Sequence, residues 1–199
     1  MGYKEQIIDS IEKYFRDVLP EYKETTVAAM KDGRKLSLFK KKDFEGHIAG
    51  FTRHKDDAMD IMQDAKGIDV PEDEEKLVEL KEKLMSSIVT FTFLCDNNIA
   101  LYSLMDRNQK KDKTVDMREF KTVASRMNKT LDNATNDLNR LETAYNVYMG
   151  NAKPEAKEAL EEAIAEERAE AEAEAKARAE AEAKVRAEAK RREEELADD

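Results

Sequence analysis

Two histidines are the first residues in this chain whose type and spacing suggest the chemistry of a site. His47 and His54 are the only histidines, and their separation of seven residues places both on one side of a predicted helix. Imidazole nitrogens bind metal ions inside helical bundles when neighbouring helices complete the ligand set. Because two helical turns extend about 10 Å along the axis, this spacing is wide for one ion. Two hydrogen-bonded core histidines are the alternative interpretation.

An acidic loop gives a second candidate site for a metal ion. The segment DRNQKKDKTVDMREF begins at Asp106, and its second half resembles the latter part of an EF-hand calcium loop. With Glu119 at the twelfth position, Asp112 and Asp116 stand at the fifth and the ninth. Lysines occupy the third and sixth positions, where the EF-hand uses an acidic ligand and a turn-forming glycine. The alternative is that Thr114 or Asp116 caps the next helix.

Basic residues in two predicted connections form a third candidate site. In an up-down-up-down bundle the first and third connections emerge at the same end, so these residues are expected to meet there. Such a surface can bind an acidic protein, a nucleic acid or an anionic lipid, although solvated loops would carry the same charges. Few aromatic residues accompany them, which gives base stacking little support. We define the basic pole as Arg34, Lys35, Lys40, Lys41 and Lys42 of the first connection and Arg107, Lys110, Lys111 and Lys113 of the third.

The sequence offers few other groups for catalysis. Cys95 is the only cysteine, and there is no glycine-rich phosphate loop, zinc-type cysteine set or nucleophile–base–acid arrangement. We therefore expect no enzymatic activity, no catalytic residues and no cofactor. The first residues, MGYKEQIIDS, lack the apolar core of a signal peptide, and a single cysteine allows no intrachain disulfide. Both observations predict a cytoplasmic location.

Composition predicts the elements that position these residues. Charged residues make up 40% of the 199-residue chain and hydrophobic residues another 40%, with only six glycines and three prolines. This composition favours an all-α protein. We predict an antiparallel bundle of about four long helices over residues 1–150 and a highly charged helical tail over residues 151–199. From Glu155 onward there are 17 acidic and 9 basic residues, so residues 155–199 carry −8 of the net charge of −10.

Apolar residues recurring three and four positions apart predict the four helices of the bundle. Their expected ranges are residues 3–30, 43–66, 72–105 and 115–149. Pro20 either kinks the first helix or begins a new segment in its first turn, and Gly33 is expected to end that helix after Met30. The predicted core stripe of the first helix is Ile8, Ile11, Phe15, Val18 and Tyr22. That of the last helix is Phe120, Ala124, Met127, Leu131, Ala134, Leu138, Leu141, Tyr145 and Tyr148.

The third predicted helix admits two other interpretations. Residues 88–93 alternate in a way typical of a strand, but both flanks are helical, so we predict helix. The stretch from Leu84 to Met105 is also long enough to cross a bilayer and contains Asp96 as its only charge. Because polar residues stand at its middle, we expect a helix buried in protein rather than in lipid.

The tail alternates alanine with charge from Ala171 to Lys190, and the sign of the charge flips every fourth residue. Opposite charges four apart stabilise a helix, whereas a strand gains nothing from that spacing. The tail lacks the apolar stripe of a coiled coil, so we predict a single charged helix that reaches about 66 Å. Its composition resembles the alanine-, glutamate- and lysine-rich helical spacers of several unrelated proteins, which implies a spacer.

These observations predict a non-enzymatic interaction or scaffold protein. Its bundle would bind a partner, most simply another protein, and the basic pole would contact an acidic protein, nucleic acid or lipid. One alternative is a bundle that binds a metal ion or small ligand at His47 and His54 or at the loop from Asp112 to Glu119. Another is a helical protein that inserts residues 84–105 into a membrane.

Overall fold

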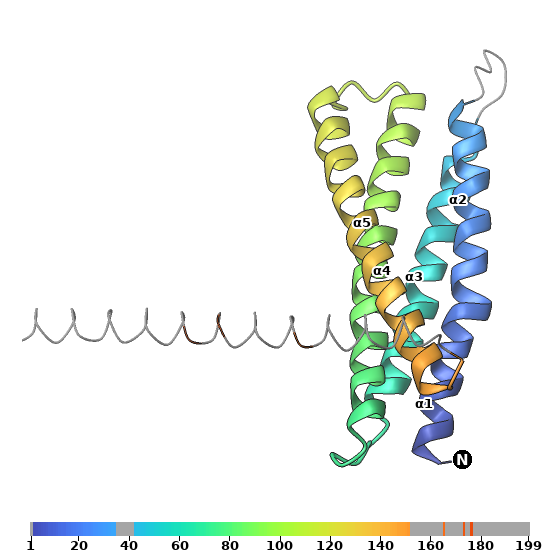
Figure 1. Cartoon of the computed structure of the whole chain (residues 1–199). Coiled ribbons are helices and arrows are strands. Elements are labelled where there is room, and N and C mark those ends of the chain that lie inside the picture. Colours follow the sequence, from blue (N-terminus) through green and yellow to red (C-terminus); the bar gives the residue numbers. More distant parts are fainter. Residues whose placement is uncertain (1, 35–41, 152–164, 166–172, 174–175, 177–199) are drawn as a thin grey trace, which may run out of the picture. The chain divides into compact units, whose positions relative to one another are not determined.

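The described part of the chain is mainly helical and forms the predicted four-helix bundle (Figure 1). The computed structural model describes residues 2–34, 42–151, 165, 173 and 176, and it forms two compact units, Met1–Gly150 and Asn151–Asp199. The first unit contains α1 (Tyr3–Lys13), η1 (Tyr14–Val18), α2 (Leu19–Arg34), α3 (Phe44–Lys66), α4 (Glu75–Gln109) and α5 (Met117–Tyr148). No strand occurs among the described residues, so the all-α prediction is confirmed. The predicted tail helix lies outside them, apart from three isolated positions.

The segments α1, η1 and α2 form one continuous rod, and α3, α4 and α5 follow in alternating directions (Figure 1). Side-chain caps set two of the helix starts. Asp43 accepts a hydrogen bond from the Gly46 amide at the start of α3, and Asp116 accepts one from the Arg118 amide at the start of α5. Residues 88–93 lie inside α4, which confirms helix over strand for that stretch.

A π-helical turn precedes Pro20 in the first rod. The Leu19 amide donates to the Tyr14 carbonyl, which lies five residues earlier rather than four. Proline has no amide hydrogen, and its ring crowds the carbonyl four residues before it, so a wider turn removes that clash. Pro20 thus stands in the first turn of a new α-helical segment. The expected end after Met30 is wrong, because α2 continues to Arg34.

An aromatic column runs through the bundle and joins α5, η1, α4, α2 and α3. Most neighbouring rings meet edge to face or stack, arrangements that add attraction beyond the area they bury. The ring-centroid distances are 5.8 Å for Tyr145–Phe15, 6.2 Å for Phe15–Tyr14, 5.8 Å for Tyr14–Phe91, 4.9 Å for Phe91–Tyr22, 5.7 Å for Tyr22–Phe51, 5.6 Å for Phe51–Tyr102 and 6.2 Å for Tyr102–Phe44.

The polar residues at the middle of α4 each have a partner from another helix. The three pairs are Lys55 Nζ–Asp96 Oδ1 at 2.7 Å, Asn97 Nδ2–Thr130 Oγ1 at 2.8 Å and Asn98 Nδ2–Tyr22 Oη at 3.0 Å. By length and composition α4 is the one described helix capable of crossing a membrane, and 44% of its most apolar window is buried inside the bundle. The paired polar groups give these residues a role within the protein core.

The core of the first rod is wider than the predicted stripe. Ile7 and Tyr14 are buried, whereas Ile8 and Phe15 beside them are only half-buried. The rod packs against both α3 and α4, so residues on two adjacent lines of the helix face the interior. The predicted stripe includes the buried residues Ile11 and Val18 and misses Ile7 and Tyr14.

Helix α5 packs mainly along α4, and its C-terminal half is held more firmly than its N-terminal half. No Cα atom of α5 lies within 8 Å of one in α2, and the two helices lie apart at the upper end of Figure 1. Its buried residues are Val123, Ala134, Leu141 and Ala144. The expected core residues Ala124 and Leu131 are exposed, Leu131 by 48%. The N-terminal half of α5 therefore has little apolar contact with the bundle.

Two phenylalanines two residues apart on α4 test this packing. Phe91 is 3% exposed and belongs to the aromatic column, whereas Phe93 is 58% exposed. Phe91→Ala should lower the free energy of unfolding by about 3–5 kcal/mol, and Phe93→Ala should change it by less than about 0.5 kcal/mol. Urea denaturation followed by circular dichroism measures both. Equal losses would place the two rings on the same face, as in a strand, and would contradict the helix.

Candidate functional site

The two histidines have separate hydrogen-bond partners on α2. His47 Nε2 lies 3.1 Å from Asp32 Oδ2, and His54 Nε2 lies 2.8 Å from Thr25 Oγ1. His54 is fully buried, and its Nδ1 has no hydrogen-bond partner. Within the described ranges no group of three or more His, Cys, Asp or Glu side chains is arranged to hold a metal ion. The geometry is that of two histidines joining α3 to α2.

The acidic loop directs its carboxylates to groups of the protein itself. Asp112 accepts hydrogen bonds from the hydroxyl and amide of Thr114, at 2.7 and 2.9 Å, and from Arg107 Nε at 2.9 Å. These donors, the Thr114 hydroxyl first, lower the pKa of Asp112 to about 2. Asp116 caps α5, as the alternative interpretation predicted. Glu119 Oε2 lies 3.9 Å from Arg107 Nη1, on the other side of that guanidinium. The loop is therefore organised around a cation of the protein.

The structure brings the first and third connections together at one end of the bundle. The Lys42 amide donates to Gln109 Oε1 at 2.9 Å, and Gln109 Nε2 donates to the Lys42 carbonyl at 3.1 Å. Lys110 Nζ contacts Glu45 Oε1 and Asp106 Oδ2, each at 2.6 Å. This meeting of connections is the arrangement that the up-down-up-down topology predicts.

At this end of the bundle the basic pole has less unpaired positive charge than its sequence suggests. Arg107 and Lys110 are both held by carboxylates. Lys111 and Lys113 are exposed and have no ion pair among the described residues. Lys42 is half-buried, and the other four members fall outside the description, namely the side chain of Arg34 and all of Lys35, Lys40 and Lys41.

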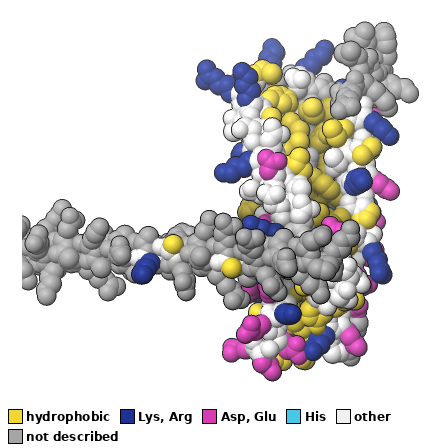
Figure 2. Space-filling model, viewed as in Figure 1, with side chains coloured by type: hydrophobic (Ala, Val, Ile, Leu, Met, Phe, Trp, Pro, Cys, Tyr) yellow, Lys and Arg dark blue, Asp and Glu magenta, His cyan; other side chains and the backbone are white. Residues whose placement is uncertain are grey.

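A line of basic residues on α5 extends this surface. We call Arg118, Lys121, Arg126 and Lys129 the α5 basic face, because spacings of three, five and three residues keep them on one side of the helix. All are exposed, and none forms an ion pair with another described residue. Residues 106–130 contain eight basic and four acidic side chains. Figure 2 shows Lys and Arg side chains gathered at the end where α4 joins α5, and Asp and Glu at the opposite end.

A cavity of about 470 Å³ lies between α4 and α5 beside this face, and we call it the α4–α5 pocket. Small α4 residues leave room opposite the second turn of α5. The floor is apolar, since Leu104 and Val123 are 6% and 4% exposed. The pocket is lined by Ala100, Ser103, Leu104 and Arg107 of α4 and by Arg118, Glu119, Thr122, Val123 and Arg126 of α5.

Sequence reasoning missed the α5 basic face and the pocket. It assigned Arg118 and Arg126 to no site, because the predicted basic pole ended in the loop before α5. The spacing of the four basic residues was the signal available in the sequence. Nothing in the sequence shows the pocket, since that depends on how far apart α4 and α5 lie.

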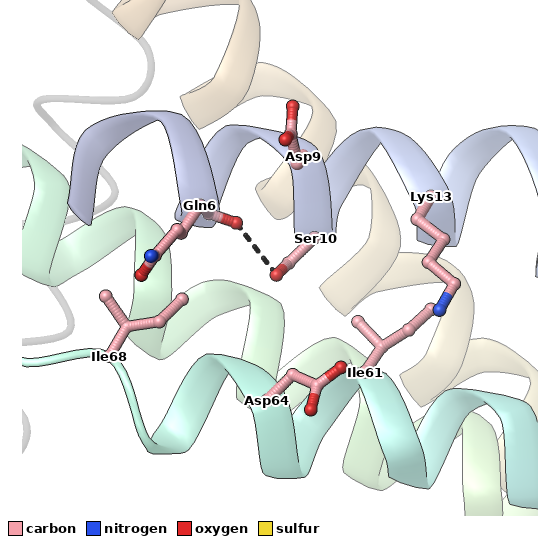
Figure 3. A pocket seen from close by; sticks show the side chains of 7 residues that line it. All are labelled: Gln6, Asp9, Ser10, Lys13, Ile61, Asp64 and Ile68. Carbon is pink, nitrogen blue, oxygen red and sulfur yellow. Dashed lines mark hydrogen bonds between the residues drawn. The ribbon is translucent and has the colours of Figure 1, made fainter. Parts of the chain in front are cut away.

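The groove between α1 and α3 has the opposite charge. One cavity there, of about 320 Å³, contains a hydrogen bond from Ser10 Oγ to the Gln6 carbonyl (Figure 3). It is lined by Gln6, Asp9, Ser10, Lys13, Ile61, Asp64 and Ile68. The next cavity along the groove is lined by Lys13, Asp17, Val18, Glu21, Asp57 and Asp60. Acidic side chains thus predominate along the groove that α3 forms with α1, η1 and α2, whereas basic ones predominate in the N-terminal half of α5.

Buried His54 makes stability depend on pH. Burial and the neighbouring Arg53 lower its pKa below the ordinary value of 6.5, and Glu21 opposes them only in part. The unfolded chain therefore takes up this proton at higher pH than the folded chain does. Stability should be greatest above pH 6.5 and should fall as the pH drops below that value.

His54→Gln keeps a side chain able to hydrogen-bond Thr25 but does not titrate. We expect the melting temperature of the unaltered protein to fall between about pH 7.5 and pH 5.5, and that of the variant to fall less. Thermal denaturation at several pH values measures both slopes. Identical slopes would show that His54 is not the group responsible.

Known families, proteins and structures give no guide to the function of this chain. No family model, no curated protein and no solved structure matches it. The geometry of the α5 basic face and the α4–α5 pocket is therefore the basis for a functional assignment.

Proposed function

We propose that this chain is a non-enzymatic interaction protein whose bundle binds an acidic segment of a partner protein through the α5 basic face. The observation that carries this proposal is the set of four exposed cations with no ion-pair partner among the described residues. Cations that make no internal ion pair contribute little to the stability of the bundle. They are available to attract and orient a partner of opposite charge.

The dimensions of this surface favour a short acidic segment. From Arg118 to Lys129 the α5 basic face extends about 16 Å along the helix. Glu119 lies among these basic residues, and Asp112 and Asp116 precede them in the sequence. A limited, interrupted patch matches a few discrete carboxylates better than the continuous phosphates of a nucleic acid, which favour a long basic groove.

Aromatic residues support the same choice. Bases of single-stranded nucleic acids stack on exposed rings, and single-stranded binding depends on them. Most of the described rings lie inside the bundle, in the aromatic column. In the part of the chain that the structure describes, Phe93 is the one aromatic residue that is more than a third exposed, and it belongs to α4. A protein partner therefore suits this surface better than a nucleic acid.

The two other functions considered from the sequence have less support. Ligand binding at the histidines would require further ligands near them, and His47 and His54 have their own partners on α2. Membrane insertion of α4 would break the pairs that Asp96, Asn97 and Asn98 make with other helices. Each unpaired polar group in lipid would cost several kcal/mol.

Charge reversal on α5 tests the proposal. In the full chain, Lys121→Glu together with Lys129→Glu should weaken binding of fluorescent poly-L-glutamate about 5- to 10-fold, since each exposed pair contributes up to about 1 kcal/mol. Added salt should weaken binding to the unaltered protein and have less effect on the variant. Lys23→Glu is the control for a charge reversal at another surface, because Lys23 is exposed on α2 and has no ion pair among the described residues.

Duplex DNA and phosphatidylserine vesicles serve as competing probes. The proposal requires poly-L-glutamate to bind and to depend on Lys121 and Lys129. If the unaltered protein and both variants bind it equally, the α5 basic face is not the site. If DNA or vesicles bind more tightly than poly-L-glutamate and show the same dependence, the partner is not an acidic protein segment.

A further inference from the structure

We propose that the α4–α5 pocket receives an apolar side chain of a helical partner segment, while Arg118 and Arg126 bind two carboxylates on either side of it. This inference rests on the proposed function and specifies the partner: an acidic residue, an apolar residue one turn later and a second acidic residue two turns from the first. The two arginines fix the spacing of the carboxylates, and the pocket between them selects the apolar residue.

The spacing follows from the positions of the arginines on α5. Arg118 and Arg126 are eight residues apart and both line the pocket. Eight residues extend about 12 Å along a helix. A partner helix lying along α5 presents residues seven or eight apart on one face at nearly the same distance. Each guanidinium can then take one carboxylate through paired hydrogen bonds.

The pocket floor accounts for the apolar residue. Leu104 and Val123 are almost fully buried, and Ala100 leaves space beside them. A cavity of about 470 Å³ lies within the size range of sites that bury a ligand group, and apolar walls favour an apolar occupant. Val123 falls between the two arginines in sequence, so the apolar contact lies between the two charged ones.

The remaining charged groups of the pocket limit where a carboxylate can bind. Arg107 is held by Asp112 and the Thr114 hydroxyl, at 2.9 and 2.8 Å. Its charge is therefore largely neutralised before a partner arrives. Glu119 lines the same pocket and repels a carboxylate placed near it. Attraction is strongest at Arg118 and Arg126, which have no ion pair among the described residues.

A helical segment fits this site because the pocket lies between two long helices that pack along each other. The groove between such helices takes a third helix through residues one turn apart. An extended segment would reach the same distance of about 12 Å with residues four apart, since a strand rises about 3.3 Å per residue. The two conformations therefore require different spacings of the acidic residues.

Two synthetic peptides of equal composition separate these cases. In the first, two glutamates are two helical turns apart with a leucine midway between them; in the second, the glutamates are one turn apart. Isothermal titration calorimetry with the full chain should show the first peptide binding at least about 10-fold more tightly, a difference of roughly 1.4 kcal/mol. Replacing its leucine with glutamine should remove most of that advantage.

Variants of the protein should change peptide binding in opposite directions. Arg118→Gln with Arg126→Gln should abolish the difference between the two peptides, and Glu119→Gln should strengthen binding of the first. Lys121→Gln with Lys129→Gln is the matched control, because these residues lie outside the pocket lining and should weaken both peptides equally. All these side chains are exposed, so the variants should have the same melting temperature as the unaltered protein.

The outcomes distinguish the inference from the function on which it rests. Equal binding of both peptides would overturn the inference, even where poly-L-glutamate binds as proposed. Tighter binding of the second peptide would overturn the helical partner and indicate an extended one. If inorganic phosphate displaces the first peptide completely and binding does not need its leucine, the pocket is a simple anion site and the inference is wrong. If poly-L-glutamate does not bind the full chain while the two peptides are still distinguished, that result would count against the proposed function.

Discussion

The aromatic column is the interaction on which the rest of the bundle depends. Rings from η1, α4, α2 and α3 follow one another in a continuous line, and Phe91 of α4 lies between Tyr14 and Tyr22 of the first rod. These contacts fix α4 as the central helix and bring its polar residues opposite their partners. The π-helical turn before Pro20 belongs to the same constraint, because it sets the rotation at which Tyr14, where the turn begins, and Tyr22, which follows it, both reach Phe91.

Helix α5 joins the column only through Tyr145, which contacts Phe15 and also donates to Glu12 at 2.8 Å. Its C-terminal half is therefore fixed to the first rod as well as to α4. Its N-terminal half contacts α4 around Val123 and makes no contact with α2. The unpaired basic residues and the α4–α5 pocket both belong to that less constrained half. Recognition of a partner is thus separated from the core that keeps the bundle folded.

The sequence predicted much of this fold because its signals are local. Asp43 and Gly67 mark the ends of α3, and the alternating direction of the helices predicted that Lys42 would lie near the end of α4. The site could be predicted only in part, because side-chain pairing between helices depends on residues far apart in the sequence. The carboxylates that hold Arg107 and Lys110 changed the charge of the predicted pole, and the outward position of Leu131 depends on the absence of a neighbour from α2.

Hydrogen exchange along α5, measured by mass spectrometry on the full chain, tests this division of the helix most directly. Amides that lose few buried contacts on opening exchange through low-energy local fluctuations, whereas those fixed to a core require larger openings. We predict that protection factors over residues 118–131 are at least about 10-fold lower than over residues 134–146, a difference of roughly 1.4 kcal/mol in opening free energy. Uniform protection along α5 would show that both halves are held equally. That result would contradict the claim that the aromatic column leaves the N-terminal half of α5 available for a partner.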